Sequence, residues 1–176
     1  MPLNVATQST GARFRIREYR PTDFETLWEI DQRCFPPGIS YSQMELRSFL
    51  TRRTAVSLVA ETHFGLHARS AEPSAAGSRS KIAGFVVAHA IRHRYGRILT
   101  LDIVPEVRRS GLGSALMLAC EERLRSLACG EVYLETAVNN DAALRLYRKL
   151  GYEVVNVLPA YYASHSLDAF AMRKVL

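Results

Sequence analysis

Residues 108–113, Arg-Arg-Ser-Gly-Leu-Gly, carry the clearest chemical signal in the sequence. They follow an apolar run that predicts a strand and precede an amphipathic run that predicts a helix. Glycine lets the backbone adopt positive φ and approach an anion closely. The first N–H groups of a helix are unpaired and lie at the positive end of its dipole. The stretch therefore predicts an anion site suited to a pyrophosphate, with a helix start flanked by solvated arginines as the alternative.

Two common phosphate-binding loops are excluded by the same residues. A Walker loop ends in Gly-Lys-Ser or Gly-Lys-Thr, and this stretch does not. A dinucleotide-binding fingerprint needs a third glycine and follows the first strand of its unit, and here the third glycine is missing.

A second group of reactive side chains lies downstream. Glu135 is at the end of a predicted strand, and Asn140 and Tyr147 are seven residues apart in the predicted helix that follows. Seven residues span about two helical turns, so both side chains lie roughly on one face. Acetyl transfer from a thioester requires a neutral amine, a stabilised carbonyl oxygen and a proton for the leaving thiolate. Glu135 could accept a proton directly or through water, Tyr147 could donate one, and Asn140 could bind a pantetheine arm. A core tyrosine and a solvated glutamate are the alternatives.

The elements that must position these residues predict an α/β fold. Hydrophobic periodicity predicts strands over residues 14–16, 54–61, 81–93, 98–104, 131–137, 152–158 and 168–175. It predicts helices over residues 24–35, 42–50, 112–128 and 140–150. In the first helix, Asp31 interrupts an otherwise apolar stripe. The order of elements indicates a mixed sheet with helices on both faces and a strand-helix-strand crossover over residues 101–137.

Length and composition indicate a soluble protein with one domain over residues 13–176, preceded by a flexible tail over residues 1–12. The Ala-, Ser-, Gly- and Pro-rich residues 65–80 predict a mobile loop. Cys34, Cys120 and Cys129 show no metal-binding spacing and suit a reducing compartment as small core residues. No apolar run resembles a signal peptide or spans a bilayer, so we expect a cytoplasmic protein without membrane association.

The net charge of +6 favours an anionic partner, but no nucleic-acid-binding motif accompanies it. Nucleic acid is therefore not the expected partner. The five histidines are scattered; His89 and His93 lie four apart in a predicted strand with no third ligand. We expect no metal site.

Together these motifs resemble the GNAT superfamily of N-acetyltransferases. The pattern Arg108-x-x-Gly111-x-Gly113 is similar to its acetyl-CoA loop, and the resemblance covers most of residues 14–176. Further residues are similar to its RimI branch: Leu134, Glu135, Asn140, Ala143, Leu146, Tyr147, Leu150, Gly151, Tyr152, Tyr161, Tyr162, Asp168, Ala169 and Met172. The resemblance implies a mixed, mostly antiparallel sheet of about seven strands, splayed at its centre. It also implies acetyl-CoA as donor, CoA as product, and the N-terminal α-amine of a protein, such as a ribosomal protein, as acceptor.

The resemblance also implies roles for individual residues. Glu135 would be the general base and Tyr147 the general acid. The residues that would bind acetyl-CoA are Leu101, Asp102, Ile103, Arg108, Arg109, Ser110, Gly111, Leu112, Gly113, Ser114, Asn140 and Tyr147. The backbone of residues 101–103 would pair with the pantetheine arm like an extra strand. The residues that would hold the acceptor peptide are Phe35, Pro36, Tyr41, Tyr161 and Tyr162.

Two positions depart from the family pattern. Asp102 stands where the family has a small apolar residue, so it is either a second base or a solvated strand carboxylate. The RimI branch carries a Trp after the Pro of its peptide-binding loop, whereas residues 38–41 here are Gly-Ile-Ser-Tyr. The second departure leaves the acceptor sequence open, but not the reaction.

Intrinsic basicity favours an α-amine as acceptor. At neutral pH an α-amine is roughly 14% neutral and a lysine about 0.04% neutral, so one carboxylate base has less deprotonation to perform. A small-molecule amine acetyltransferase on the same fold remains an alternative, and a closed acidic pocket would favour it over an open peptide groove. A non-catalytic acyl-CoA-binding module is a third hypothesis. Oligomeric state is left open.

Overall fold

The computed structural model describes residues 14–62, 81–91 and 94–176 of the 176-residue chain. The expected tail, the expected loop over residues 65–80, and His63, His67 and His93 lie outside these residues.

The described strands form one seven-stranded sheet in the order β1-β2-β3-β4-β5-β7-β6. The bounds are β1 (Phe14–Glu18), β2 (Ala55–Thr62), β3 (Lys81–Ile91), β4 (Tyr95–Ile103), β5 (Glu131–Ala137), β6 (Glu153–Tyr162) and β7 (Leu167–Val175). Every neighbouring pair is antiparallel except β4 and β5, which are parallel. The predicted α/β fold with a mixed, mostly antiparallel sheet is confirmed.

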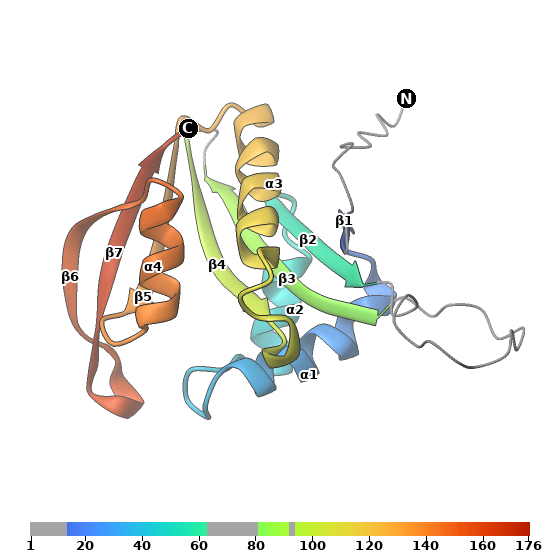
Figure 1. Ribbon diagram of the computed structural model, residues 1–176, viewed down its shortest axis with the longest axis horizontal. Coiled ribbons are helices and arrows are strands. Elements are labelled where there is room, and N and C mark those ends of the chain that lie inside the picture. Colours follow the sequence, from blue (N-terminus) through green and yellow to red (C-terminus); the bar gives the residue numbers. More distant parts are fainter. Residues whose placement is uncertain (1–13, 63–80, 92–93) are drawn as a thin grey trace, which may run out of the picture.

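The sheet splits between β4 and β5. These strands pair at only three positions, and the last joins Arg97 to Tyr133. Beyond it the strands separate, as Figure 1 shows where they diverge below α3 and α4. The C-terminal half of β4 therefore has one unpaired edge. We call this opening the fork.

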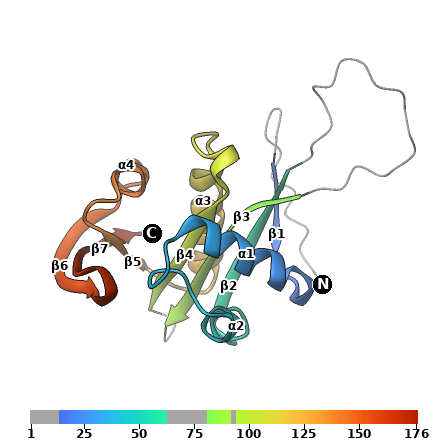
Figure 2. The same ribbon diagram turned by 90° about the horizontal axis from the view of Figure 1, so that it is seen from below.

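Helices cover both faces of the sheet, as predicted. Helices α3 (Leu112–Ser126) and α4 (Asp141–Lys149) lie on one face, and α1 (Phe24–Cys34) and α2 (Gln43–Leu50) lie on the other (Figure 2). The two cores are separate because side chains of a strand alternate between faces. In β3, Val86 and Ala88 join the core under α3, whereas Phe85 and Val87 join the core under α1.

Local sequence explains where the helices begin. Ser42 and Glu45 form a capping box at the start of α2, each side chain accepting the other's backbone N–H. Asn140 Oδ1 caps α4 by accepting the N–H of Ala143 at 3.2 Å. Three short 3-10 helices connect other elements: η1 (Pro21–Asp23), η2 (Pro105–Val107) and η3 (Ala163–His165).

Several strand ends differ from the sequence prediction. Strand β3 is described over Lys81–Ile91, and the last two residues of its predicted range lie outside the described residues. Strand β4 begins at Tyr95, before the predicted start at residue 98. Gly96 makes the early start possible, because an added Cβ there would lie 2.5 Å from Leu124 of α3. Strand β6 continues through Pro159 to Tyr162, past its predicted end at residue 158. Proline is tolerated there because β6 is an edge strand with an irregular register after Leu158.

The cysteines, the length of the helices and the groups of possible metal ligands can also be compared with the sequence predictions. Cys120 and Cys129 are buried, and half-buried Cys34 donates its S–H to the Ile103 carbonyl at 3.3 Å. No helix in the described part of the chain is long and apolar enough to cross a membrane. Within the same residues, no group of three His, Cys, Asp or Glu side chains could hold a metal ion.

Candidate active site

The unpaired edge of β4 presents backbone groups to the fork. The Leu99 carbonyl accepts the Tyr41 hydroxyl at 3.0 Å, and the Ile103 carbonyl accepts Arg108 Nε at 3.0 Å. By strand alternation the N–H and C=O of Leu101 point the same way. The Asp102 carbonyl faces β3 instead, where an added Cβ on Gly84 would meet it at 2.5 Å. The expectation that Asp102 pairs with a pantetheine arm through its backbone is therefore corrected, whereas Leu101 and Ile103 face the fork.

The glycine-rich loop forms an open anion site at the start of α3. Arg109 and Gly111 have positive φ values of 61° and 89°. The first intrahelical bond runs from Ala115 N–H to the Gly111 carbonyl, so the N–H groups of residues 112–114 have no helical partner. An added Cβ on Gly111 would meet nothing within 4 Å. These features fit a phosphate group.

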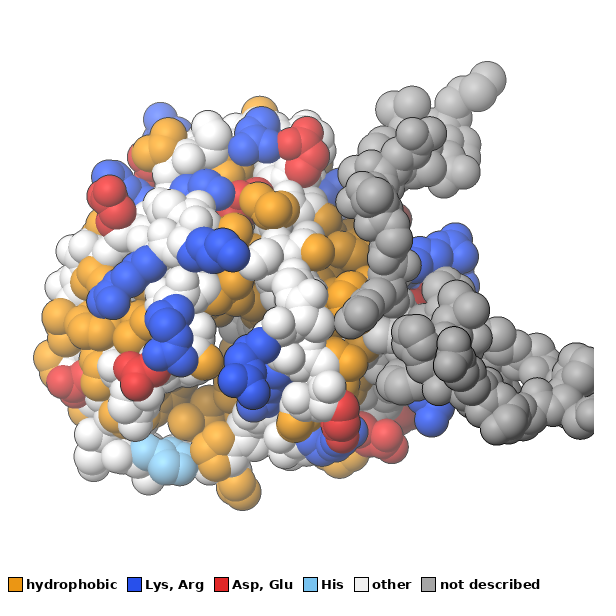
Figure 3. Space-filling model, in the orientation of Figure 1, with side chains coloured by type: hydrophobic (Ala, Val, Ile, Leu, Met, Phe, Trp, Pro, Cys, Tyr) orange, Lys and Arg blue, Asp and Glu red, His pale blue; other side chains and the backbone are white. Residues whose placement is uncertain are grey.

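The second glycine of the loop has a different role from the first. An added Cβ on Gly113 would lie 3.2 Å from Leu146 of α4. This position is therefore small because the Leu146 side chain of α4 reaches the start of α3. Figure 3 shows a hollow between α4 and the turn before α3, with Lys and Arg side chains on both sides. In this region Arg108, Arg109, Arg145, Arg148 and Lys149 are exposed.

Tyr147 is buried in α4, with its ring centroid 5.9 Å from that of Tyr152. Burial, together with the nearby Asp102 and Tyr162, raises the pKa of Tyr147 above its usual value. The hydroxyl therefore retains its proton at neutral pH and can act as a donor. Asn140 starts the same helix but uses Oδ1 as a cap, which leaves its amide nitrogen as the group available to a ligand.

Glu135 on β5 forms an ion pair that the sequence did not predict. Arg97 Nε and one terminal nitrogen each lie 3.2 Å from Glu135 Oε2, and that terminal nitrogen lies 3.3 Å from the Tyr161 hydroxyl. Arg97 is the last β4 residue paired with β5, so its guanidinium spans the start of the fork. The sequence contained one indication of this ion pair, because Arg97 directly precedes a predicted buried strand. Its partners, however, come from strands that are far away in the sequence.

The predicted acceptor residues line two segments that meet beside the fork. Tyr41 precedes α2, and its ring packs edge-on against Phe49 at 5.1 Å. Tyr161 and Tyr162 end β6, with ring centroids 5.1 Å apart. Burial, followed by the nearby Tyr161 and Glu135, raises the pKa of Tyr162 to about 12. Ser164 Oγ donates to the Gly38 carbonyl at 3.2 Å and joins the two segments. We call these two segments together the acceptor entrance.

Phe35 and Pro36 belong to the first of these segments. Phe35 is half-buried at the end of α1, and its N–H donates to the Asp31 carbonyl at 3.0 Å. Pro36 is exposed, and its carbonyl accepts the N–H groups of Ile39 and Ser40 at 3.1 Å each. The loop therefore turns back toward Tyr41.

Asp102 is fully buried, so the interpretation as a solvated strand carboxylate is wrong. Its Oδ1 accepts the Thr100 hydroxyl at 2.7 Å, and its Oδ2 has no hydrogen-bond partner among the described residues. Asp102 lies opposite Phe85, so its side chain points under α1 and away from solvent. Burial raises the pKa of this carboxyl well above its usual value.

Comparisons with known proteins show the family of the chain. The family model described as the Acetyltransferase (GNAT) family matches residues 24–152. An N-alpha-acetyltransferase of Sulfurisphaera tokodaii is 29% identical over 97% of this chain and 98% of that protein. The N-alpha-acetyltransferase RimI of Mycobacterium tuberculosis is 35% identical over 56% of this chain and 63% of its own. The crystal structure of Ard1 from Thermoplasma volcanium superposes with a TM-score of 0.77 and 28% identity, covering 94% and 99% of the two chains.

Proposed function

The chain belongs to the acetyltransferase (GNAT) family, and from that premise we propose that it acetylates the N-terminal α-amine of a protein. As an enzyme of this family it takes the acetyl group from acetyl-CoA and releases CoA. The acceptor is supported by the relatives, which carry the name N-alpha-acetyltransferase. A ribosomal protein is the acceptor class that the similarity to RimI favours.

The acceptor entrance is the observation that carries this proposal. Tyr41 stands on one side, Tyr161 and Tyr162 stand on the other, and the Ser164–Gly38 hydrogen bond bridges the two segments. A bridged entrance admits the end of a chain more readily than a side chain in the middle of one, because mid-chain residues need a groove open at both ends.

The donor fits the opposite side of the fork. Acetyl-CoA supplies an acetyl thioester when bound. The free N–H groups at the start of α3 and the arginines at positions 108 and 109 would hold its pyrophosphate. The fork-facing backbone of Leu101 and Ile103 would bind the pantetheine arm, with the Asn140 amide nitrogen nearby.

Two side chains would handle protons. Glu135 would accept the proton of the acceptor amine, directly or through water, while its ion pair with Arg97 fixes its position. Tyr147 would give its proton to the leaving sulfur, and burial ensures that the phenol holds a proton at neutral pH.

A small amine such as a polyamine or aminoglycoside is the second candidate acceptor. Such polycations require a strongly negative pocket. Glu135, the acid on the fork side of β5, is already paired with Arg97, which weakens the negative potential that a polycation would need.

A thiol-release assay with acetyl-CoA tests the proposal. The acceptors are short peptides with varied first residues, including ribosomal-protein N-termini, alongside N-terminally blocked peptides containing lysine, polyamines and aminoglycosides. We expect turnover only with free N-termini. Turnover confined to small amines would overturn the proposed acceptor.

A matched pair of variants tests the proposed acid. Tyr147→Phe should lower kcat by about 100-fold or more while acetyl-CoA binding persists. Tyr152→Phe removes another buried hydroxyl from the same core, one that donates to Glu121 at 3.0 Å, and should leave kcat within about twofold. Equal losses in both variants would contradict the role of Tyr147.

A further inference from the structure

Two buried carboxyls, those of Asp31 and Asp102, face the contact between α1 and β4. Asp31 is fully buried and lies one helical turn before Cys34, whose S–H donates to the carbonyl of Ile103. Asp102 directly precedes Ile103 in β4 and points to the α1 side of the sheet. A second link, the bond from the Tyr41 hydroxyl to the Leu99 carbonyl, lies on the other side of Asp102 along the strand. Both acids therefore lie at the contact between α1 and β4.

Each of these acids has an oxygen without a partner. Among the buried side-chain atoms of the described residues, three make no hydrogen bond: Asp31 Oδ1, Asp102 Oδ2 and Ser57 Oγ. Neither carboxyl forms an ion pair within residues 14–62, 81–91 and 94–176. A buried carboxylate without a cation is costly, so stability alone does not favour two acids here.

A proton on one of the two acids removes one of the two buried charges. Burial raises the pKa of Asp31 to about 6 and that of Asp102 well above its usual value, and Asp31 contributes to the rise at Asp102. At neutral pH Asp31 is therefore mostly ionised, whereas burial favours the protonated form of Asp102. A protonated carboxyl carries no charge, and the charge of one acid disfavours ionisation of the other.

The pair is connected to the acceptor entrance through Tyr41. Asp31 Oδ2 accepts the Tyr41 N–H at 2.8 Å. On the other side of the same residue, Gln32 Nε2 and Trp28 Nε1 donate to the Tyr41 carbonyl at 2.8 and 3.3 Å. Helix α1 thus holds the backbone of Tyr41 from both directions, and the hydroxyl is held by β4.

We propose that a proton on one of the two acids, Asp31 or Asp102, keeps α1 seated on β4 and Tyr41 in place, so that acceptor binding, and not acetyl-CoA binding, weakens when both acids are ionised. They are positioning residues, and the inference rests on the proposed function in placing Tyr41 at the acceptor entrance. Loss of that proton places two like charges between α1 and β4, which pushes the helix and Tyr41 away.

Other titratable and charged groups surround the pair. Cys34 lies on α1, Tyr41 on the loop, Glu45 on α2, Arg108 after η2 and Tyr147 on α4. Burial raises the pKa of Cys34, Tyr41 and Tyr147 above their usual values, so these three stay neutral at neutral pH. Arg108 is the cation of this set, and it is exposed with Nε on the Ile103 carbonyl. It lowers the pKa of Asp102 less than burial raises it, and no ion pair joins it to either acid among the described residues.

The fluorescence of Trp28 tests the inference without any turnover. Trp28 is the only tryptophan of the chain, and its indole N–H is bonded to Tyr41. The wild-type emission should change reversibly as pH rises above neutrality, and Asp102→Asn should remove that change because an amide cannot ionise. Asp31→Asn should do the same and serves if Asp102→Asn does not fold. Identical titrations of wild type and both variants would overturn the inference.

Glu121→Gln is the matched control. Glu121 is also a buried acid, but it lies on the opposite face of the sheet and is bonded to Tyr152 and Lys174. Its variant should titrate like wild type in the Trp28 assay. A variant of this acid that abolished the Trp28 signal would show that the signal is not specific to the α1–β4 contact, and would overturn the assignment.

Kinetics provide the second test, with whichever amine the enzyme acetylates. The ratio of wild-type KM to Asp102→Asn KM is taken at each pH, which cancels the ionisation of the acceptor itself. For the acceptor this ratio should rise about tenfold between pH 7 and the alkaline limit, the effect of roughly one pKa unit of coupling. For acetyl-CoA it should stay constant. Parallel changes for both substrates would contradict the inference while leaving the proposed acceptor standing.

Discussion

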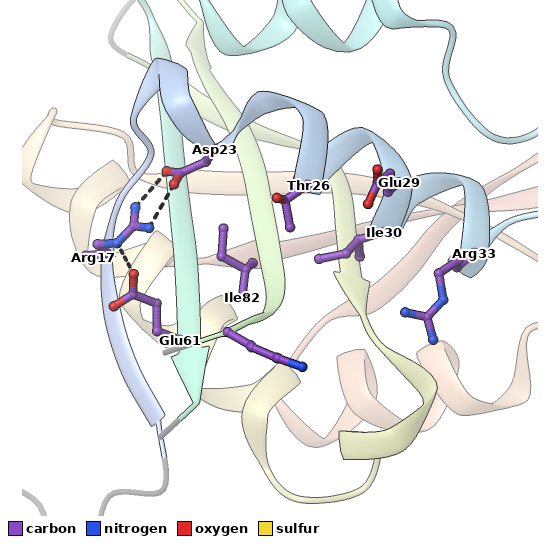
Figure 4. Close-up of a pocket in the computed structure, with 9 residues that line it drawn as sticks. Arg17, Asp23, Thr26, Glu29, Ile30, Arg33, Glu61 and Ile82 are labelled. Carbon is purple, nitrogen blue, oxygen red and sulfur yellow. Dashed lines mark hydrogen bonds and ion pairs between the residues drawn. The ribbon is translucent and has the colours of Figure 1, made fainter. Parts of the chain in front are cut away.

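The two ends of helix α1 handle buried charge in opposite ways. At its start, Arg17 donates to both oxygens of Asp23 at 2.7 and 2.9 Å and to Glu61 at 2.7 Å (Figure 4). These three side chains are only 9–14% exposed, and each charge has an opposite partner. Toward the other end of the helix, Asp31 and Asp102 are buried, and neither forms an ion pair with a cation in the part of the chain that the structure describes. The buried acids near the start of α1 are therefore paired with an arginine, whereas the buried acids near its end are not paired with a cation among the described residues.

We connect the charge cluster at the start of α1 with stability and the acids near its other end with function. The cluster at Arg17 borders a cavity of about 390 Å³ between α1 and the neighbouring strands, and it fixes β1, β2 and η1 together. The pair at Asp31 and Asp102 adds no such ion pair but adjoins the acceptor entrance. Local rules of folding are most often broken at functional sites, which is why the uncompensated end is the one that we connect to catalysis.

Arg17→Met should produce the largest effect. Removing one partner of a buried ion pair leaves unpaired charge, here on Asp23 and Glu61, and costs about 3–5 kcal/mol of unfolding free energy. Denaturant unfolding measures this loss. The acceptor KM of the folded fraction should not change, because the cluster is at the far end of α1. A loss below about 1 kcal/mol would remove the contrast between the two ends.

Asp31→Asn should come next, and its effect depends on pH. The pKa of Asp31 rises from 3.8 in the unfolded chain to about 6 in the fold. A raised folded pKa gives stability that is present below pH 3.8 and lost as pH rises through 6. The loss amounts to about 3 kcal/mol, from roughly 1.36 kcal/mol per pKa unit. The stability of the variant relative to wild type should therefore rise by about that amount between pH 3.5 and 7.5 in urea titrations. Parallel curves would contradict the uncompensated burial of Asp31.

These acids also show what the sequence could and could not predict. The helices and most strands follow from periodicities of 3.6 and 2, and Asp31 was visible as the interruption of an apolar stripe. The side of β4 on which Asp102 lies was not visible. The register shift between Val87 and Ala88 leaves Leu99 unpaired, so alternation counted from Ile98 assigns Asp102 to the wrong face.

Some parts of the candidate site could be predicted from the sequence, and others could not. The anion loop is local, because its glycines, arginines and helix start are contiguous in the sequence. The position of the fork came from the family resemblance, since no local pattern marks where two strands stop pairing. Arg97 escaped notice because its partners, Glu135 and Tyr161, are 38 and 64 residues away.

Thr100→Val should have a smaller effect at the uncompensated end. The Thr100 hydroxyl is bonded to Asp102 Oδ1 at 2.7 Å. Losing this bond inside the core should cost about 1–3 kcal/mol, and it should also change the Trp28 titration. Thr136→Val replaces another buried threonine, on β5, and serves as the control. Its Trp28 titration should match that of wild type. If both variants behave alike, the hydroxyl is not part of the pair.

Glu106→Gln should have the smallest effect, although it removes an ion pair at the same end of α1. Arg33 lies 2.6 Å from Glu106, but the two side chains are 54% and 61% exposed. Water already solvates both charges, so their attraction contributes little to stability. We expect no measurable change in Tm and no change in the Trp28 titration. A clear fall in Tm would mean that this surface pair stabilises the C-terminal end of α1. The two ends of the helix would then differ in how exposed their ion pairs are, and not in whether the acids have a cationic partner.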